Sequence, residues 1–286
     1  MSKINFNNIA ILLFLTFTLA SCKKNDVEID ENKMGDFSVE FQNIMGGETF
    51  KLDWEYKNAK NEPFKVSTLN YFISNIKLKN ANGETYVVPA EESYFLVKAD
   101  DLSSRFTNVK VPEGDYTELS FILGVDSLRN TMNVEDRKGV LSFDPDAGHS
   151  GGGMYWGWNS GYIFFKYEGT CQLISDDQNG DPTGKKQFKY HIGGFGGYSS
   201  PTINNIKEIT LNLSNAGNAQ VREGFRSNAH LFVDISKVFN GPNVISIVEH
   251  PNVMFSEFSQ NIANNFPSMF SHDHTENFVK SSEELD

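Results

Sequence analysis

The sequence predicts an all-β protein, an antiparallel β-sandwich of about ten strands with a few short helical turns. Short runs such as FSVEFQNI at 37–44 and YFISNIKLKN at 71–80 are alternating or continuously apolar, which is typical of strands. Between the runs lie turn signals such as Asn82-Gly83 and Gly241-Pro242. No long amphipathic helical pattern interrupts them, so the strands are expected to pack as two sheets.

Helical turns are expected near residues 137, 237 and 262, where VEDRKG, DISKVFNG and FSQNIANNFPSMF lie. Length alone fits one large sandwich or two small ones, but no linker divides the run, so 37–286 is predicted to be one sandwich domain. The strand sequences are FSVEFQNI, FKLDWEY, YFISNIKLKN, TYVVPA, YFLVKA, ELSFILGVD, YIFFKYEG, QFKYHIGG, EITLNL, HLFVDI and VISIVE.

The first residues resemble the signal peptide of a bacterial lipoprotein. Lys3 precedes an apolar run at 9–20 that is too short to span a bilayer. Leu19-Ala20-Ser21 then precedes Cys22, the position at which lipoproteins are acylated. We therefore expect 1–21 to be a lipoprotein signal peptide and the mature chain to be an extracytoplasmic lipoprotein of the outer membrane, on its periplasmic or surface face. The alternative is an ordinary signal peptide followed by a chance cysteine.

The residues after the leader are acidic, and so is the whole chain. Residues 22–36 are predicted to form an acylated cysteine and a flexible tether that joins the lipid to the domain. The formal net charge is -12, and no basic stripe offsets it, which argues against nucleic acid as a partner. With Cys22 lipidated, Cys171 has no disulfide partner; it is expected to be a small buried apolar side chain, with metal ligation as the alternative.

Four histidines are candidate metal ligands. His149 lies in a glycine-rich loop, DPDAGHSGGGMYW, and His191 ends the predicted strand QFKYHIGG. His272 and His274 form His-Asp-His; in an extended segment such a pair shares a face at about 6 to 7 Å, close enough for one metal ion. Neutral imidazole suits copper or zinc. The alternatives are a hydrophilic tail with chance histidines and, for His191, a structural role.

Nothing in the chain indicates a nucleophilic enzyme, so a non-enzymatic protein is predicted. Ser160 lies in WNSGY, which lacks the first glycine of Gly-x-Ser-x-Gly. The carboxylate-rich loop at 176–181 is a candidate for calcium or a solvated hairpin tip, and it lacks the alternation of an EF-hand loop. His230 and His250 are expected to be structural.

The most unusual stretch is GGGMYWGWNSGYIFFKYEG at 151–169. In a strand, Trp156 and Trp158 share one face, and such an aromatic pair is typical of a core or of ligand stacking. Gly157 between them indicates close approach of another backbone.

The same block carries a resemblance to a known family. YFISNIKL, LSFILGVDSLRN, GMYWGWNSGYIFFKYEG, YHIGG and NFPSMFSHDH occur in this order in the MbnP family of secreted, copper-associated proteins, many of them lipoproteins. The resemblance covers nearly all of the mature chain, and the tryptophan block is its most specific part. It implies a β-sandwich-like domain and, as partner, a secreted MauG-like di-haem oxidase that oxidises a tryptophan.

The resemblance also implies a copper site. In the relatives CorA and MopE a tryptophan becomes kynurenine and binds copper together with histidines. By this resemblance Trp158 and Trp156 are the candidates for oxidation, with Trp158 favoured because WNSGY is the more distinctive half of the motif. His191 is the candidate ligand, completed by His272 or His274. Unlike in those relatives, no histidine follows either tryptophan closely, and His149 precedes them.

Three functions remain open on the sequence. The first is a membrane-anchored copper-binding protein with a modified tryptophan. The second is an extracellular glycan- or peptide-binding lipoprotein that uses the same aromatic residues for stacking. The third is a copper-dependent enzyme, against which the lack of a nucleophile or acid-base pair argues.

Overall fold

The computed structural model describes residues 29–142, 153–156, 161–176 and 184–280. These residues form strands β1 (Asp30–Met45), β2 (Glu48–Thr49), β3 (Glu55–Lys57), β4 (Pro63–Asn80), β5 (Thr85–Val87), β6 (Tyr94–Lys98), β7 (Phe106–Leu123), β8 (Tyr155–Trp156), β9 (Gly161–Thr170), β10 (Gln187–Gly193), β11 (Lys207–Asn212), β12 (Ala219–Val221), β13 (Phe225–Asp234), β14 (Asn252–Val253) and β15 (Phe270–Lys280). The α-helices are α1 (Ser127–Thr131) and α3 (Ser259–Ala263), and 3-10 turns cover Ala90–Glu92, Leu102–Arg105, Val134–Asp136, Gly139–Leu141, Ile235–Val238 and Phe266–Met269.

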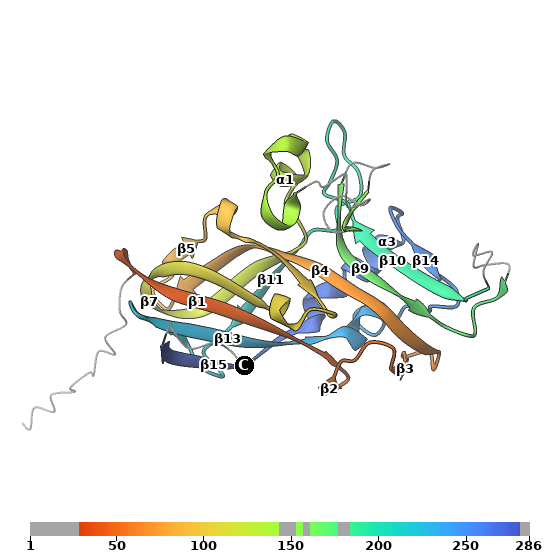
Figure 1. The fold of residues 1–286 in the computed structure, drawn as a ribbon, viewed down its shortest axis with the longest axis horizontal. Helices are drawn as coiled ribbons and strands as arrows, with labels where there is room; N and C mark the ends of the chain where they lie inside the picture. Colours follow the sequence, from red (N-terminus) through yellow and green to blue (C-terminus); the bar gives the residue numbers. More distant parts are fainter. Residues whose placement is uncertain (1–28, 143–152, 157–160, 177–183, 281–286) are drawn as a thin grey trace, which may run out of the picture.

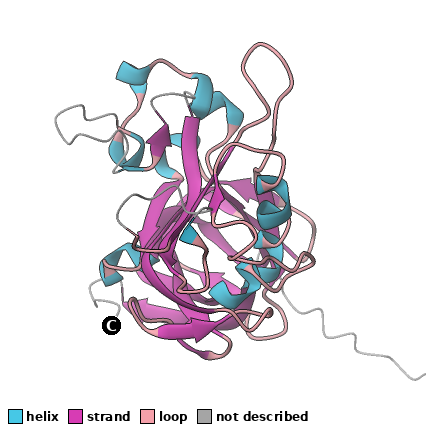
Figure 2. Ribbon diagram, turned by 90° about the vertical axis from the view of Figure 1, so that its right-hand side faces the viewer, coloured by secondary structure: helices cyan, strands magenta, loops and turns pink. Residues whose placement is uncertain are grey.

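The predicted all-β class is confirmed, as the predominance of strands in Figure 2 shows. The main path of the sheet runs β14-β10-β9-β4-β7-β1-β13-β15, and the remaining strands pair along it. Most neighbours are antiparallel, but β1 runs parallel to β13 and β10 runs parallel to β14. The sheet is therefore mixed, whereas the sequence predicted antiparallel pairing throughout.

The two halves of the sheet are joined through the long strand β7. Its first half pairs with β1, and its second half pairs with β4, β11 and β12. The strands therefore form one continuous sheet and not two separate packed sheets, because β7 belongs to both halves. Figure 1 shows β13 and β15 at the opposite side of the molecule from β9, β10 and β14.

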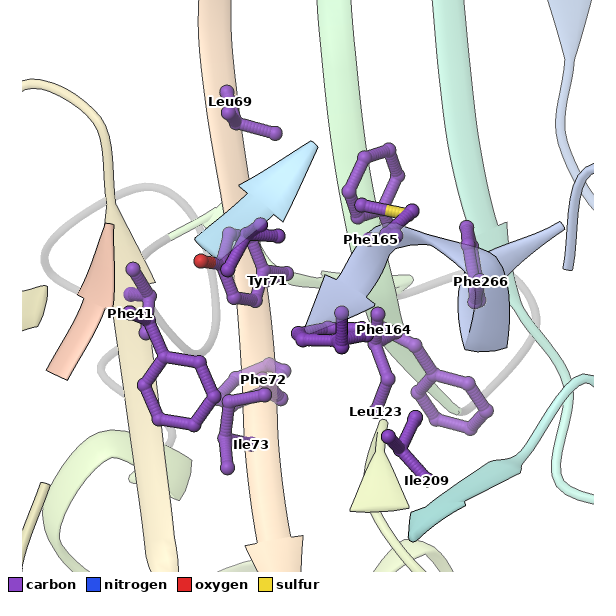
Figure 3. Close-up of a cluster of buried hydrophobic side chains, with 14 of the residues drawn as sticks. Phe41, Leu69, Tyr71, Phe72, Ile73, Leu123, Phe164, Phe165, Ile209 and Phe266 are labelled. Atoms are coloured by element: carbon purple, nitrogen blue, oxygen red, sulfur yellow. The ribbon is translucent and has the colours of Figure 1, made fainter. Parts of the chain in front are cut away.

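Aromatic side chains fill the interior between these strands. Phe41 of β1, Phe121 of β7 and Phe270 of β15 contact one another edge to face, with ring centroids 5.1 to 6.3 Å apart. Figure 3 shows the neighbouring part of the core, where Tyr71 of β4 and Phe165 of β9 stack at 6.1 Å. Burial of so many large side chains accounts for the strands' continuously apolar sequences.

A few elements differ from the sequence prediction. The run at 244–249 is a turn instead of a strand, although Ile245 and Ile247 are buried as a strand's residues would be. β1 begins at Asp30, so regular structure starts within the predicted tether. The helical turns expected near 137, 237 and 262 are present. Within the described residues, no helix has both the length and the apolar character needed to cross a bilayer.

Candidate functional site

The tryptophan block enters the fold as a short strand beside β9. Tyr155 pairs with Tyr162 and Trp156 pairs with Gly161, so β8 folds back on the start of β9. The tyrosine rings of the first pair contact edge to face at 5.2 Å. Trp156 is buried, with 4% of its surface exposed. The block therefore anchors one indole within the folded domain.

The indole of Trp156 lies against the backbone of β10 at Gly193. A Cβ atom on Gly193 would sit 2.8 Å from the indole Cζ3 and 2.4 Å from the carbonyl oxygen of Tyr162. No other residue type leaves room for this approach, so glycine at this position serves the contact. The ring of Phe255 packs edge to face against the same indole at 6.1 Å.

Trp156 also forms part of the wall of a cavity of about 470 Å³. Aromatic residues and glycines make up about half of the lining, and α1, the segment at 134–137 and the loop after β10 contribute the remainder. This is the size range of small-molecule sites in proteins. The lining residues are Asn130, Thr131, Val134, Arg137, Tyr155, Trp156, Gly161, Gly194, Phe195, Gly197, Tyr198, Ser199, Ser200, Thr202 and Phe255.

One positive charge is held in the cavity wall. The guanidinium of buried Arg137 lies 5.1 Å from the ring of Tyr155 and 5.2 Å from that of Tyr162, a cation-π arrangement. The phenol of Tyr162 donates to the carbonyl oxygen of Leu141 at 2.5 Å. Burial raises the pKa of Tyr162 to about 12, despite the opposing effect of Arg137, so this phenol stays protonated at neutral pH.

His191 sits on β10 in a short hydrogen bond to a carboxylate. Its Nε2 atom is 2.6 Å from Oε1 of Glu168 on β9, and its backbone pairs with Lys166. Burial opposes ionisation of Glu168, but the hydrogen bond from His191 and the charge of Lys166 outweigh it and lower the pKa of the carboxyl group. An ionised Glu168 holds the His191 ring in place and leaves Nδ1 as the second ring nitrogen.

His191 and Gly193, the glycine that contacts the Trp156 indole, lie at the same end of β10. Gly193, which supports the indole, is two residues beyond His191, a rise of about 6 to 7 Å along a strand. The structure thus brings two of the predicted site residues into one region. The glutamate and the glycine that hold them were not predicted.

The two C-terminal histidines, His272 and His274, lie on different faces of their strand, which differs from the prediction. In the β13–β15 pair, His230 lies opposite His274 and Leu231 opposite His272, so Asp273 is the extra residue of a β-bulge. Directly paired side chains share a face, so His274 lies with His230, and His272 lies with the fully buried Leu231. The prediction that His272 and His274 share a face is wrong, because the bulge breaks the alternation.

The bulge gathers His230, Asp273 and His274 into one cluster. Oδ2 of Asp273 is 3.0 Å from Nδ1 of His230 and 2.8 Å from Nδ1 of His274. Each of the three residues offers a ligand atom, and these atoms lie within 4.8 Å of one another. His230 was predicted to be structural; a cross-strand pair with a distant segment leaves no local signal in the sequence.

His272 is separate from this cluster. Its Nε2 contacts Oγ1 of Thr275 at 2.9 Å, and burial lowers the pKa of its ring. Nor does the structure unite His191 with either C-terminal histidine, since β10 and β15 lie toward opposite ends of the sheet order and on opposite sides in Figure 1. The predicted completion of one site by His191 with His272 or His274 is therefore wrong.

Some predicted residues lie outside the described part of the chain. These are His149, Trp158, Cys22 and most of the carboxylate loop at 176–181. Its first residue, Asp176, is described and pairs with Lys186 at 3.2 Å. Cys171 is buried in the core, as expected of a small apolar side chain, and burial raises the pKa of its thiol.

Fold and site together define an all-β protein with a tryptophan-lined cavity, a carboxylate-bound histidine on the strand that contacts this tryptophan, and a histidine cluster on a distant strand pair. The chain belongs to the MbnP family, whose model matches residues 34–255. It is similar to the solved structure of MbnP from Methylosinus trichosporium, with 14% sequence identity, 76% of this chain and 82% of that chain covered, and a TM-score of 0.48. No curated protein matches the chain.

Proposed function

We propose that this protein is a membrane-anchored, extracytoplasmic copper-binding protein, without enzymatic activity of its own, whose site contains a tryptophan oxidised to kynurenine. The oxidant is a secreted MauG-like di-haem oxidase. The observation that carries the proposal is the packing of the Trp156 indole on Gly193, on the strand that presents His191. Membership of the MbnP family supports the association with copper.

The surroundings of His191 suit a metal ligand. Ligating histidines commonly donate their other ring N–H to a carboxylate, which fixes the tautomer and raises the basicity of the ligating nitrogen. Glu168 occupies that position, with 2.6 Å between its Oε1 and Nε2 of His191. Nδ1 of His191 is then the atom that would hold copper. Imidazole is a suitable ligand for copper in either oxidation state.

Oxidation gives the tryptophan the second ligand group. The indole N–H is a hydrogen-bond donor only. Cleavage of the C2–C3 bond of the pyrrole ring, with one oxygen atom added to each of the two carbons, gives formylkynurenine in a four-electron oxidation, and hydrolysis by water then releases the formyl carbon as formic acid. The product carries an aryl amine and a ketone, both of which can coordinate a metal ion. At the di-haem oxidase, one molecule of dioxygen, or two molecules of hydrogen peroxide that leave as water, supplies the oxygen atoms and takes up the four electrons, and this chain supplies the substrate side chain.

The cavity beside Trp156 supports this chemistry. Ring opening frees the aryl amine and the ketone, which remain neighbours on the benzene ring, from the fused pyrrole ring, and the oxygenated product needs space that a closely packed core lacks. The cavity of about 470 Å³ borders the indole and provides that space. Trp158 and His149 stay in the proposal as the other oxidation candidate and a further ligand candidate.

The location follows from the N-terminal sequence. Residues 1–21 supply a lipoprotein signal peptide, and acylated Cys22 anchors the chain in the outer membrane. A lipid anchor keeps the domain in the compartment to which a secreted di-haem enzyme is delivered. Both proteins then meet outside the cytoplasm.

The cavity itself favours a second candidate function. Tyr198 is 78% exposed at its rim, and Tyr155, Phe195 and Phe255 add further rings to the lining. Exposed rings above a polar floor also suit stacking on a sugar or a peptide. On this alternative, a glycan or peptide binds in the cavity while both tryptophans stay unmodified.

Co-expression with the di-haem oxidase tests the proposal. Full-length protein produced with and without that oxidase is compared by intact mass, peptide mapping and copper content. We expect a modified peptide covering 153–166, and copper bound at the site of Trp156 and His191, only after co-expression. Trp156→Phe should remove the modification. Trp54→Phe, which replaces an exposed tryptophan, is the matched control and should retain it. Unmodified Trp156 and Trp158 together with no copper, and saturable binding of a glycan or peptide, would instead establish the alternative.

A further inference from the structure

We propose that His230, His274 and Asp273 form a second metal site, on the outer face of the β13–β15 pair, which takes one divalent transition-metal ion, Zn²⁺ or Cu²⁺. It is distinct from the copper site proposed at Trp156 and His191, and it does not depend on any modified residue. His230 and Asp273, which the sequence did not single out as ligands, supply two of its three protein ligands.

The ligand atoms are already close to coordination geometry. A tetrahedral site with metal–ligand bonds of about 2.0 to 2.1 Å separates neighbouring ligand atoms by about 3.3 Å. Oδ2 of Asp273 lies 3.0 Å from Nδ1 of His230 and 2.8 Å from Nδ1 of His274. The two imidazole rings are 4.9 Å apart, centroid to centroid. A small outward movement of the ligand atoms therefore admits an ion between them.

The pairing of three strands brings these residues together. His230 is paired on one side with Glu40 of β1 and on the other with His274 of β15, which sets the three residues in a row across three strands. The bulge at Asp273 then turns the carboxylate to the face of that row. Bulges commonly re-aim a side chain next to a functional site. Without the extra residue, Asp273 would point to the opposite face.

The charges around the cluster favour a cation. Oε1 of Glu40 is 3.8 Å from Nε2 of His230, and Oε1 of Glu276 is 3.8 Å from Nε2 of His274. These carboxylates can orient the rings from behind, as outer carboxylates do in zinc sites. Arg105 pairs with Glu40 at 3.2 Å and offsets one of the negative charges. Carboxylates outnumber the fixed positive charges, and Asp273 remains available as an anionic ligand.

The donor set decides the kind of metal. Two imidazoles and a carboxylate suit zinc and copper(II), whereas copper(I) prefers softer sulfur ligands. His230 is buried, but the side chains of His274 and Asp273 are 48% and 37% exposed. The exposed side of the cluster therefore leaves room for a water molecule as a fourth ligand and for entry of the ion.

Metal titration of matched variants tests the site. Full-length protein, stripped with a chelator, is titrated with Zn²⁺ and separately with Cu²⁺ against a chromophoric competitor. His274→Asn and Asp273→Asn, both at exposed positions, should weaken binding by more than about 100-fold, because even loss of an outer-shell partner costs 10- to 100-fold. His272→Asn, two residues from His274 but on the other face, is the control and should bind as the wild type does.

A spectroscopic measurement separates this site from the one at Trp156. In Cu²⁺-loaded Trp156→Phe/His191→Ala protein, electron paramagnetic resonance should still show two coordinating nitrogens, and one fewer after His274→Asn. Equal binding by wild type and His274→Asn, or loss of binding in His272→Asn instead, would overturn the assignment. Neither result bears on kynurenine formation, so the two proposals can fail separately.

Discussion

At the scale of single residues, the contact between Trp156 and Gly193 explains the glycine-rich, aromatic character of two distant segments. Glycine at 193 lets the indole reach the backbone of β10, and the same strand presents His191 to Glu168. The tryptophan block therefore meets the YHIGG segment in the fold, which neither segment indicates alone.

Adding one methyl group at Gly193 tests this contact. In Gly193→Ala the new Cβ would lie 2.8 Å from the indole and 2.4 Å from a backbone oxygen, so the ring or the strand must move. We expect a loss of about 1 to 3 kcal/mol in the free energy of unfolding. Near-ultraviolet circular dichroism should also report a displaced tryptophan. Gly161→Ala is the control, since its Cβ would meet only ordinary contacts from 3.5 Å outward, and equal losses in both variants would contradict the account.

The carboxylate behind His191 provides a second test at this scale. Glu168→Gln keeps the size of the side chain but removes the charge that accepts from Nε2 of His191. We expect copper affinity of the co-expressed protein to fall by about 10- to 100-fold. Competition with a copper(I) chelator measures the change. Unaltered affinity would show that His191 is not a ligand supported by Glu168.

At the scale of elements, the alternation of apolar and polar residues predicted most strands. One apolar run that was predicted as a strand is instead held by hydrogen bonds to a buried polar side chain. The apolar run at 244–249 was predicted as a strand. In the structure Glu62 caps this run, because its carboxylate accepts from the backbone N–H of Ile247 at 2.7 Å and from Oγ of Ser246 at 2.5 Å. Such a side-chain cap removes the need for a partner strand. Sequence periodicity carries no sign of it.

A buried asparagine holds the loop next to this turn. The amide of Asn265 donates to the carbonyl oxygens of Val238 and Asn243 at 3.0 and 2.7 Å and accepts from Asn243 N at 2.8 Å. Asn265→Ala leaves these backbone groups without their partner, so we expect a destabilisation of about 2 to 4 kcal/mol. Denaturant unfolding measures it. Asn264→Ala, which changes the exposed neighbouring residue, is the control. Its free energy of unfolding should change by no more than about 0.5 kcal/mol.

The parts of the candidate site that could be predicted are those with a local signal in the sequence. Trp156 and His191 were identified because their segments carry local signals, a tryptophan block and a strand ending in glycines. His230 was read as structural because its partners are on β1 and β15, far away in sequence. His272 was grouped with His274 because a bulge is invisible to strict alternation. Cross-strand pairing and register decide both cases.

At the scale of the whole molecule, the mixed sheet separates two groups of candidate ligands. His191 lies toward one end of the sheet order, and the His230–Asp273–His274 cluster lies toward the other. The long strands β4, β7 and β1 stand between them along the main path. Sites so separated are expected to bind independently.

This independence can be measured directly. Binding at the outer cluster should be unchanged by Trp156→Phe, and copper binding at the site of Trp156 and His191 after co-expression should be unchanged by His274→Asn. In the double variant the two losses of binding free energy should add within about 0.5 kcal/mol. A double-variant cycle from competition titrations provides the numbers. A larger coupling would place both groups of residues in one site.

Peptide mapping of the full-length protein co-expressed with its di-haem oxidase, combined with copper analysis of the same sample, tests the central claim most directly. We predict that the peptide covering 153–166 contains kynurenine in place of one tryptophan, that copper beyond the amount held by the His230–Asp273–His274 cluster is bound in proportion to this modification, and that His191→Ala abolishes this additional copper while leaving the modification. Unmodified tryptophans in protein that binds this additional copper, or a modified peptide in protein that lacks it, would contradict it.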